Sequence, residues 1–202
     1  MDIITPQILY HGTTDDLLPH FRQKLLNARY WRPGRDFGEG FYTTISSDQA
    51  RKWAVKSAMD RFERVNPCVL EIELHSLPAD FTPLVFLSDS LAWAKFILDH
   101  RMTTRKGEDP CLRHPDLIVG PMADSDTGKI VKDCVNLNKD IHWFYDQIVR
   151  SPRGRRLDSL RLGNQVVFAN EQWERHVRLV GYHVQMKGRW ISHGGASASQ
   201  SI

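Results

Sequence analysis

The residues Asp36–Thr44, Asp-Phe-Gly-Glu-Gly-Phe-Tyr-Thr-Thr, join a glycine turn to a short aromatic and β-branched stretch. The two glycines interrupt regular structure, and the residues after them favour an extended strand. Downstream, Ser-Ser-Asp offers an N-cap for a helix over 49–62. The sequence therefore predicts a turn, a strand and a helix in this order, with the ring of Tyr42 presented from the strand.

Other segments on both sides of this stretch also carry strand or helix patterns. Leu70, Ile72 and Leu74 alternate with polar side chains, which predicts a strand with one buried face over 69–75. Further strands are predicted over 7–11 (ended by Gly12), 116–120, 165–168 and 177–185. Further helices are predicted over 89–101 and 140–149. Because strands and helices do not alternate regularly, we predict an α+β fold with mostly antiparallel strands.

Length and composition indicate one ordinary globular domain. The chain has 202 residues, 41% hydrophobic and 25% charged, so we expect a single domain over 1–190 and a flexible tail over 191–202. It has no run of apolar residues long enough to span a membrane and no secretion signal at its start. Three cysteines argue against a disulfide framework and for a reducing compartment, so we expect a cytoplasmic location.

Three predicted strands carry polar or aromatic residues that suit a binding site. The first contains His11 followed by Gly12, the second contains Tyr42, and the third opens with Asn164 and Gln165. Each has a structural explanation as well. A lone histidine is more often a structural hydrogen-bonding group, an aromatic strand is often core, and polar residues commonly open strands. It is their order along the chain that is informative.

In that order, the three segments resemble the ADP-ribosyltransferase superfamily of the His-Tyr-Glu type. The segments are Tyr10-His11-Gly12-Thr13, the Asp36–Thr44 stretch, and the late strand that opens with Gln165. Together with Ile118-Val119-Gly120-Pro121-Met122-Ala123-Asp124, they look like a bacterial branch associated with toxin–antitoxin and defence settings. The resemblance runs from about Ile8 to Phe168, and Asp36–Thr44 is its most specific part.

The resemblance implies a split antiparallel β-sheet around an NAD+ cleft, with flanking helices, and NAD+ as the co-substrate. It implies that His11 hydrogen-bonds the adenosine ribose, that the main chain of Gly12 holds the nicotinamide amide, and that Tyr42 stacks on the nicotinamide ring. The same resemblance extends the NAD+ site to Thr13, Thr43 and Arg35. The implied activity is mono-ADP-ribosyl transfer to an acceptor.

Gln165 departs from the family pattern, because the resemblance implies a glutamate at this position. A glutamine still accepts a hydrogen bond from a ribose hydroxyl, and the lost charge would weaken transition-state stabilisation by ~1–3 kcal/mol. Glu39 and Glu171 are alternative carboxylates, ranked after Gln165. Two other functions stay open: an NAD+ glycohydrolase, and a non-catalytic NAD+- or nucleic-acid-binding module of the same fold.

An arginine-rich segment precedes the last of the three strands. Arg153, Arg155 and Arg156 can bind phosphates, so we expect a nucleic-acid acceptor, RNA favoured, slightly ahead of a protein acceptor. A solvated loop, an acidic antitoxin partner or the NAD+ phosphates are the alternatives. The implied biological role is a bacterial toxin or anti-phage effector.

One further set of residues contains side chains of the types that bind zinc. Cys111 and His114, with Cys134 and His142, offer metal-binding side chains. They lack paired Cys-x-x-Cys and His-x-x-x-His spacing, so structural cysteines are the favoured explanation and no metal is expected.

Overall fold

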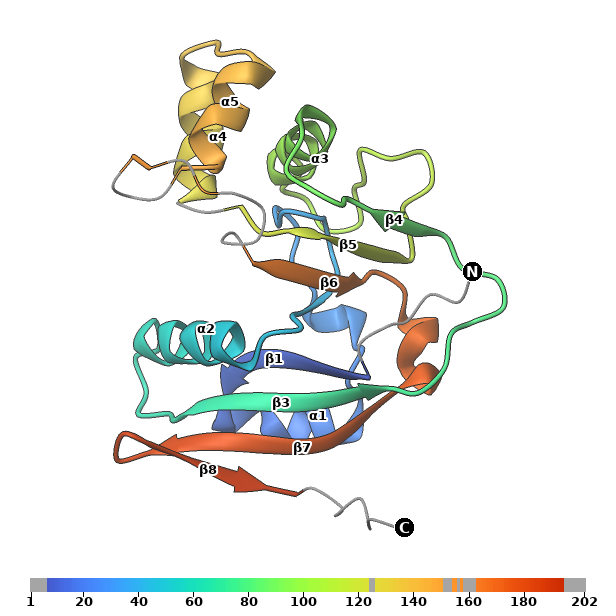
Figure 1. Cartoon of the computed structure of the whole chain (residues 1–202), viewed down its shortest axis with the longest axis vertical. Helices are drawn as coiled ribbons and strands as arrows, with labels where there is room; N and C mark the ends of the chain where they lie inside the picture. The colour runs from blue at the N-terminus through green and yellow to red at the C-terminus, as the bar shows by residue number, and fades with distance from the viewer. Residues whose placement is uncertain (1–6, 124–125, 151–153, 156, 158–162, 195–202) are drawn as a thin grey trace. The chain divides into compact units, whose positions relative to one another are not determined.

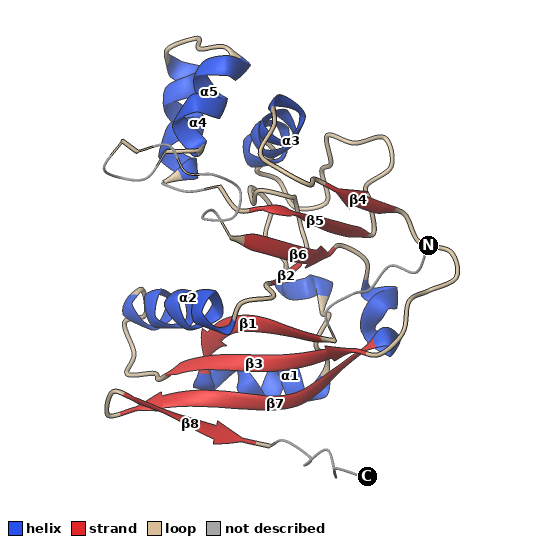
Figure 2. Cartoon of the chain, viewed as in Figure 1, coloured by secondary structure: helices blue, strands red, loops and turns tan. Residues whose placement is uncertain are grey.

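The computed structural model describes residues 7–123, 126–150, 154–155, 157 and 163–194. They form two compact units, each assembled from segments that are distant in the sequence. Of the described residues, unit 1 takes those within 1–26, Thr43–Ala79 and 172–202, and unit 2 takes those within Asn27–Tyr42 and Asp80–Glu171. Figure 2 shows helices and strands in both, so the predicted mixed α+β class is confirmed.

Unit 1 contains a four-stranded antiparallel sheet with the order β1-β3-β7-β8. Helix α1 passes behind its strands in Figure 1. The elements of this unit, in chain order, are β1 (Ile8–Thr14), η1 (Asp15–Leu17), α1 (Leu18–Gln23), α2 (Ser47–Met59), β3 (Pro67–Leu74), β7 (Val177–Met186) and β8 (Arg189–His193), with η3 (Glu171–His176) leading into β7.

Local sequence explains two of these elements directly. Ser46 caps α2, because its side chain accepts a hydrogen bond from the main-chain N–H of Gln49. The helix ends at Met59, earlier than predicted, and Phe62 beyond its end is fully exposed. In β3 the predicted alternation is confirmed, with Leu70 and Ile72 fully buried.

β1 does not end at Gly12, as the sequence suggested, but continues to Thr14. Gly12 lies inside the strand because helix α2 packs directly on it. A Cβ atom at this position would overlap the carbonyl oxygen of Ala50 and lie 2.8 Å from the main-chain nitrogen of Ala54. Here a glycine marks a close approach between helix and strand rather than a strand end.

Strand β8 was not predicted. Lys187 and Gly188 both have positive φ, 50° and 77°, which is the conformation of a two-residue type I′ hairpin turn between β7 and β8. As a consequence, residues 191–193 belong to a strand and not to the flexible tail expected from 191 onward. Residues 195–202 lie outside the described residues.

Unit 2 contains a second four-stranded sheet, with the order β2-β6-β5-β4. β5 and β6 are antiparallel, whereas β4 and β5 are parallel, so this sheet is mixed. The pairings of the unit 1 sheet are all antiparallel, in line with the expectation of mostly antiparallel strands. Its elements are η2 (Ala28–Tyr30), β2 (Phe41–Thr43, which reaches the first residue of a unit 1 segment), β4 (Pro83–Val85), α3 (Leu91–Met102), β5 (Leu117–Pro121), α4 (Thr127–Asn136), α5 (Ile141–Ile148) and β6 (Asn164–Phe168). β4 and α4 were not predicted from the sequence.

The helices and the sheet of unit 2 enclose one apolar core. Trp93 and Ile97 of α3 and Phe144 of α5 are fully buried in it, together with Phe37 from the glycine turn. Gly120 of β5 leaves room for the Phe37 ring, which would lie 3.1 Å from a Cβ atom there. Among the described residues, no helix has both the length and the apolar character needed to span a membrane.

Candidate functional site

β1 is an edge strand, paired with β3 on one side only. On its other side Tyr10 exchanges two main-chain hydrogen bonds with Thr44, at 2.8 and 2.9 Å. Main-chain groups of alternate residues point to the same side of an antiparallel strand, so the N–H and C=O of Gly12 also point away from β3. The N–H and C=O of Gly12, two residues beyond the Tyr10–Thr44 bridge, are a donor and an acceptor side by side. A carboxamide group, which also has one donor side and one acceptor side, can pair with such an arrangement.

The imidazole of His11 lies on the sheet face opposite α2, since neighbouring residues of a strand point to opposite faces. It is half-buried and packs edge-on against Phe21 of α1, with 5.4 Å between the ring centroids. Thr13 is on the same face as His11 and is buried. His11 therefore lies inside β1 rather than at its end, because the strand continues to Thr14.

The glycine turn holds the hydroxyl of Tyr42. This hydroxyl donates a hydrogen bond to the carbonyl of Gly38 at 2.7 Å and accepts one from the N–H of Phe37 at 3.0 Å. Gly38 has φ of +79°, which favours glycine over any other residue. Tyr42 is partly buried as a residue and packs against the unit 2 core.

Burial raises the pKa of Tyr42 far above its ordinary value, and the nearby Asp36 carboxylate adds to the increase. The phenol is therefore neutral at any physiological pH. Tyr42 therefore cannot act as a general base.

Two interactions fix the ends of the same turn. Asp36 accepts a charged hydrogen bond of 2.7 Å from Nε of Arg101, on α3. Glu39 accepts one of 2.6 Å from the main-chain N–H of Gly107. The Glu39 carboxylate, considered as a substitute catalytic group, thus anchors a loop, whereas Arg35 is exposed.

Gln165 lies in β6 and only 6% of its surface is exposed. Its Nε2 donates to the carbonyl of Pro121 at 3.5 Å, and the indole N–H of Trp93 donates to the same carbonyl at 3.0 Å. Among the described residues its Oε1 has no hydrogen-bond donor. Gln165 shares a strand face with Val167, a member of the unit 2 core. The hydrogen bond to Pro121 holds the nitrogen of the Gln165 amide, and its oxygen is left as an acceptor.

The structure therefore brings some of the predicted site residues together and not others. Tyr42 and Gln165 come from neighbouring strands of one sheet and lie beside one apolar core. Four of the other predicted residues belong to unit 1. Thr43 is buried and is the last residue of β2, but it begins a unit 1 segment, and His11, Gly12 and Thr13 are in unit 1 as well.

The remaining predicted residues have these positions. Glu171 accepts a hydrogen bond of 2.7 Å from the main-chain N–H of Ala28 and so anchors the start of η2. Arg155 is exposed. Arg153 and Arg156 lie outside the described residues.

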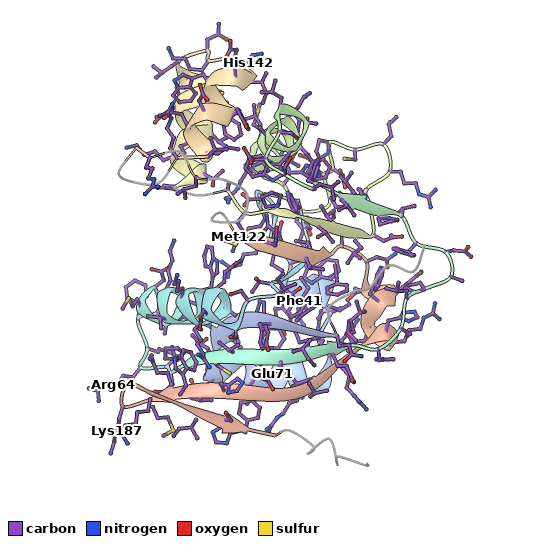
Figure 3. The ribbon with its side chains drawn as sticks, viewed as in Figure 1. Phe41, Arg64, Glu71, Met122, His142 and Lys187 are labelled. Atoms are coloured by element: carbon purple, nitrogen blue, oxygen red, sulfur yellow. The ribbon has the colours of Figure 1, made fainter. Side chains whose placement is uncertain are left out.

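A separate group of ionisable side chains lies behind the glycine turn in unit 2. One ligand atom each from His100, Asp109 and His114 lies within 4.8 Å of the others. Burial lowers the pKa of His100, so its ring is neutral at neutral pH. Cys134, considered with His114 in the sequence, instead donates its thiol to the carbonyl of Lys139 within the helical part of the unit. His142, labelled in Figure 3, lies on α5.

A comparison with protein-family models matches residues 7–178 to a family described as "Protein of unknown function (DUF3990)". The chain belongs to this DUF3990 family. No curated protein and no solved structure matches it.

The DUF3990 match begins just before β1 and ends at the second residue of β7. It therefore includes His11, Tyr42 and Gln165, the whole sheet of unit 2, and the sheet of unit 1 without most of β7 and without β8. It also includes the group around His100.

Sequence reasoning missed His100 and Asp109 of that group. His100 was absorbed into the apolar pattern of the helix predicted over 89–101, and Asp109 lies in a stretch without periodicity. A signal was present in the spacing Asp-x-Cys-x-x-His over 109–114, which contains three metal-binding residue types within six positions.

Proposed function

We propose that this DUF3990 protein is an NAD+-dependent mono-ADP-ribosyltransferase. The proposal is supported by the order of the His11, Tyr42 and Gln165 segments, all three of which are strands. The observation that carries most weight is that Tyr42 and Gln165 lie on neighbouring strands, with the acceptor oxygen of Gln165 not engaged by the described residues.

The reaction breaks the bond between the nicotinamide nitrogen and C1′ of its ribose. Nicotinamide leaves with the bonding electron pair, positive charge develops on the ribose, and an acceptor nucleophile attacks C1′ and loses its proton. In this proposal the ring of Tyr42 stacks on nicotinamide, while Oε1 of Gln165 accepts a hydrogen bond from a ribose hydroxyl. A bond that strengthens as charge develops lowers the barrier.

Gly12 supports the proposal through its main-chain geometry. A nicotinamide carboxamide could pair with its outward N–H and C=O, as a second strand would. His11 would bind the adenosine ribose, and Arg35 is sufficiently exposed to contact a phosphate. The ADP-ribosyltransferase-like split sheet with an NAD+ cleft, expected from the sequence, is part of this proposal.

The decisive experiment measures nicotinamide release from NAD+ by wild type and by three variants. Gln165→Ala removes the acceptor oxygen and should reduce release by ~10–100-fold, equivalent to about 1.5–3 kcal/mol. Gln165→Glu restores the carboxylate and should increase release. Gln147→Ala, a half-buried glutamine of α5 in the same unit, is the control and should leave release unchanged. Equal rates for wild type and Gln165→Ala would reject the assignment of Gln165.

The destination of the ADP-ribose separates the remaining possibilities. NAD+ labelled in its adenosine part is incubated with the protein and lysate, which is then treated with protease or nuclease. Nuclease-sensitive label would support an RNA or DNA acceptor and the role of the arginines, and protease-sensitive label a protein acceptor. Free ADP-ribose would indicate an NAD+ glycohydrolase, and NAD+ binding without release a non-catalytic module.

We also propose a biological setting. A bacterial cytoplasmic toxin or anti-phage effector of this kind would be held inactive by an antitoxin. Expression of wild type should then arrest growth, while Gln165→Ala at equal protein level should not.

A further inference from the structure

The stretch between α3 and β5 is long and irregular. Residues 103–116 contain no helix or strand, yet His114 has its ring half-buried against the end of α3. Loop backbone of this length needs side-chain contacts to fix it. Asp109, Cys111 and His114 of this loop all converge on His100, the one buried histidine among the described residues, at 2% exposure.

The tautomers of the two histidines follow from their hydrogen bonds. Nδ1 of His100 lies 2.7 Å from the carbonyl oxygen of Phe96, and Nδ1 of His114 lies 2.9 Å from that of Pro115. A carbonyl only accepts, so each Nδ1 carries the proton. In the neutral form of each ring, Nε2 then carries a lone pair, as in histidines that bind a metal.

These lone pairs point at other electron-rich atoms. Nε2 of His100 lies 3.7 Å from one carboxylate oxygen of Asp109, and Nε2 of His114 lies 3.8 Å from the other. Nε2 of His114 is buried without any hydrogen-bond partner among the described residues. Two lone pairs and a carboxylate that face one another across such gaps repel unless a proton on a ring or a metal ion lies between them.

Cys111 supplies a fourth candidate ligand. Its Sγ lies 3.8 Å from Nε2 of His100, and its main-chain N–H donates to the Asp109 carboxylate at 2.7 Å, which orients that carboxylate. In tetrahedral zinc sites, bond lengths of about 2.0–2.3 Å separate ligand atoms by roughly 3.4–3.6 Å. Three of the separations, at 3.7–3.8 Å, exceed this by a few tenths of an ångström. The group of His100, Asp109 and His114 as a whole lies within 4.8 Å and does not include Cys111, so the side chains, that of Cys111 above all, would have to move inward to close the site.

We propose that His100, Asp109, Cys111 and His114 bind one Zn²⁺ ion through Nε2, a carboxylate oxygen, Sγ and Nε2. Binding releases the Cys111 thiol proton to solvent, and the thiolate, carboxylate and two neutral imidazoles fill a closed tetrahedral set, as in structural sites. This departs from the sequence expectation that no metal is needed, and it is independent of the proposed transferase activity.

The position of the site indicates its role. A Cβ atom at Gly38 would lie 2.8 Å from the His100 ring and 2.9 Å from Nε2 of His114, so the two histidines pack directly on the glycine turn. The carbonyl of Gly38 in turn accepts the Tyr42 hydroxyl. The ion would therefore fix the 103–116 loop to α3 and support the glycine turn that orients Tyr42.

The test is titration of the chelator-treated full chain with Co²⁺, a spectroscopic substitute for Zn²⁺. Wild type should bind one Co²⁺ per chain, with the visible bands of a tetrahedral site and a thiolate-to-cobalt charge-transfer band. Cys111→Ser should lose the charge-transfer band. His114→Asn and Asp109→Asn should weaken binding by at least about 100-fold, because even outer-shell partners of metal ligands contribute about 10–100-fold.

Cys134→Ser and His142→Asn serve as matched controls, because both residues belong to the same unit and were the alternative ligands. Both should bind Co²⁺ as wild type does. Asp109 is 33% exposed, so Asp109→Asn should fold even if His114→Asn does not, and circular dichroism of the metal-free variants checks this. Wild-type binding no tighter than that of Asp109→Asn, or a charge-transfer band that follows Cys134, would overturn the proposal.

Discussion

Gly12 and His11 are neighbours in β1 with different surroundings. The side-chain position of Gly12 faces helix α2, and the ring of His11 faces Phe21 of α1. The main-chain groups of Gly12 point along the open edge of the strand. One glycine thus allows a close helix contact while its main-chain N–H and C=O point away from β3.

Replacing Gly12 by alanine should destabilise the protein. The new Cβ would meet backbone atoms of α2, which cannot rotate away, so the helix must shift. We expect a loss of about 1–3 kcal/mol in the free energy of unfolding, measured by urea denaturation. Gly128→Ala is the control, since a Cβ there meets only a side-chain oxygen of Asp126 at 3.7 Å and helical alanine is favoured. Equal stability of Gly12→Ala and wild type would show that α2 does not restrict this position.

The substitution Tyr42→Phe distinguishes a structural role of the Tyr42 hydroxyl from the proposed binding role of its ring. Tyr42→Phe removes the bonds to Gly38 and Phe37 and should lower the free energy of unfolding by about 0.5–1.5 kcal/mol, measured by thermal or urea unfolding. Because the ring is retained, nicotinamide release should change little. Tyr182→Phe, whose hydroxyl only accepts a bond from exposed Arg22, should affect neither. A large loss of release in Tyr42→Phe at unchanged stability would assign a direct role to the hydroxyl.

The carboxylate of Asp116 forms hydrogen bonds that connect the ends of β4, β5 and β6 in unit 2. Asp116, just before β5, accepts hydrogen bonds from the N–H and hydroxyl of Thr82 before β4, and from the side chain of Asn170 after β6. Burial alone would raise the pKa of Asp116, but these hydrogen bonds outweigh it and hold its pKa below the ordinary value.

This gives a pH dependence with a defined sign. A depressed pKa in the folded state adds stability above the unfolded-state pKa of about 3.9, and this contribution is lost as the pH falls through the lower folded-state value. At pH 7 Asp116→Asn should therefore lower the free energy of unfolding by about 1–2 kcal/mol. The NH₂ group of the new asparagine would face the NH₂ group of Asn170, so the hydrogen bond between these two side chains is lost. The difference from wild type should shrink below about pH 4.

Chemical denaturation at pH 7 and pH 3 measures both values. Asp80→Asn, an exposed carboxylate of the same unit, should match wild type at each pH. A difference for Asp116→Asn that persists undiminished at pH 3 would contradict the role of the carboxylate.

Neither unit is a continuous piece of the chain. Unit 2 needs Asn27–Tyr42 as well as Asp80–Glu171, and Phe37 from the first segment is fully buried in its core. Gly40 of the same segment approaches Val167 of β6 so closely that a Cβ atom would lie 2.6 Å from its methyl group. Cutting the chain between the segments therefore removes part of a core.

A fragment spanning 80–171 should not fold cooperatively. It lacks β2 and the Phe37 ring, and loss of one buried phenylalanine alone removes about 3–5 kcal/mol, a large share of the stability of a small domain. Thermal unfolding followed by circular dichroism would measure this, with the full chain as control. Addition of a peptide spanning 27–42 should restore a transition. A sharp transition in the fragment alone would show that unit 2 does not need the first segment.

Local features of the structure could be read from the sequence because they depend on neighbours along the chain. The serine cap of α2 and the alternation of β3 are determined within one helical turn or a few strand positions. The hairpin turn at Lys187 and Gly188 and the amphipathic helix α4 depend on equally local rules, but their patterns were too short or too polar to predict.

By itself, the sequence determined the mixed α+β class, the strands that carry His11, Tyr42 and Gln165, and their order along the chain. Only the tertiary structure decided that β1 continues through Gly12, that Gln165 lies beside a core with its nitrogen fixed, and that His100 meets His114. The physical reason is that strand pairing, helix packing and side-chain convergence join residues distant in sequence, and their free energy comes from contacts that no local pattern records.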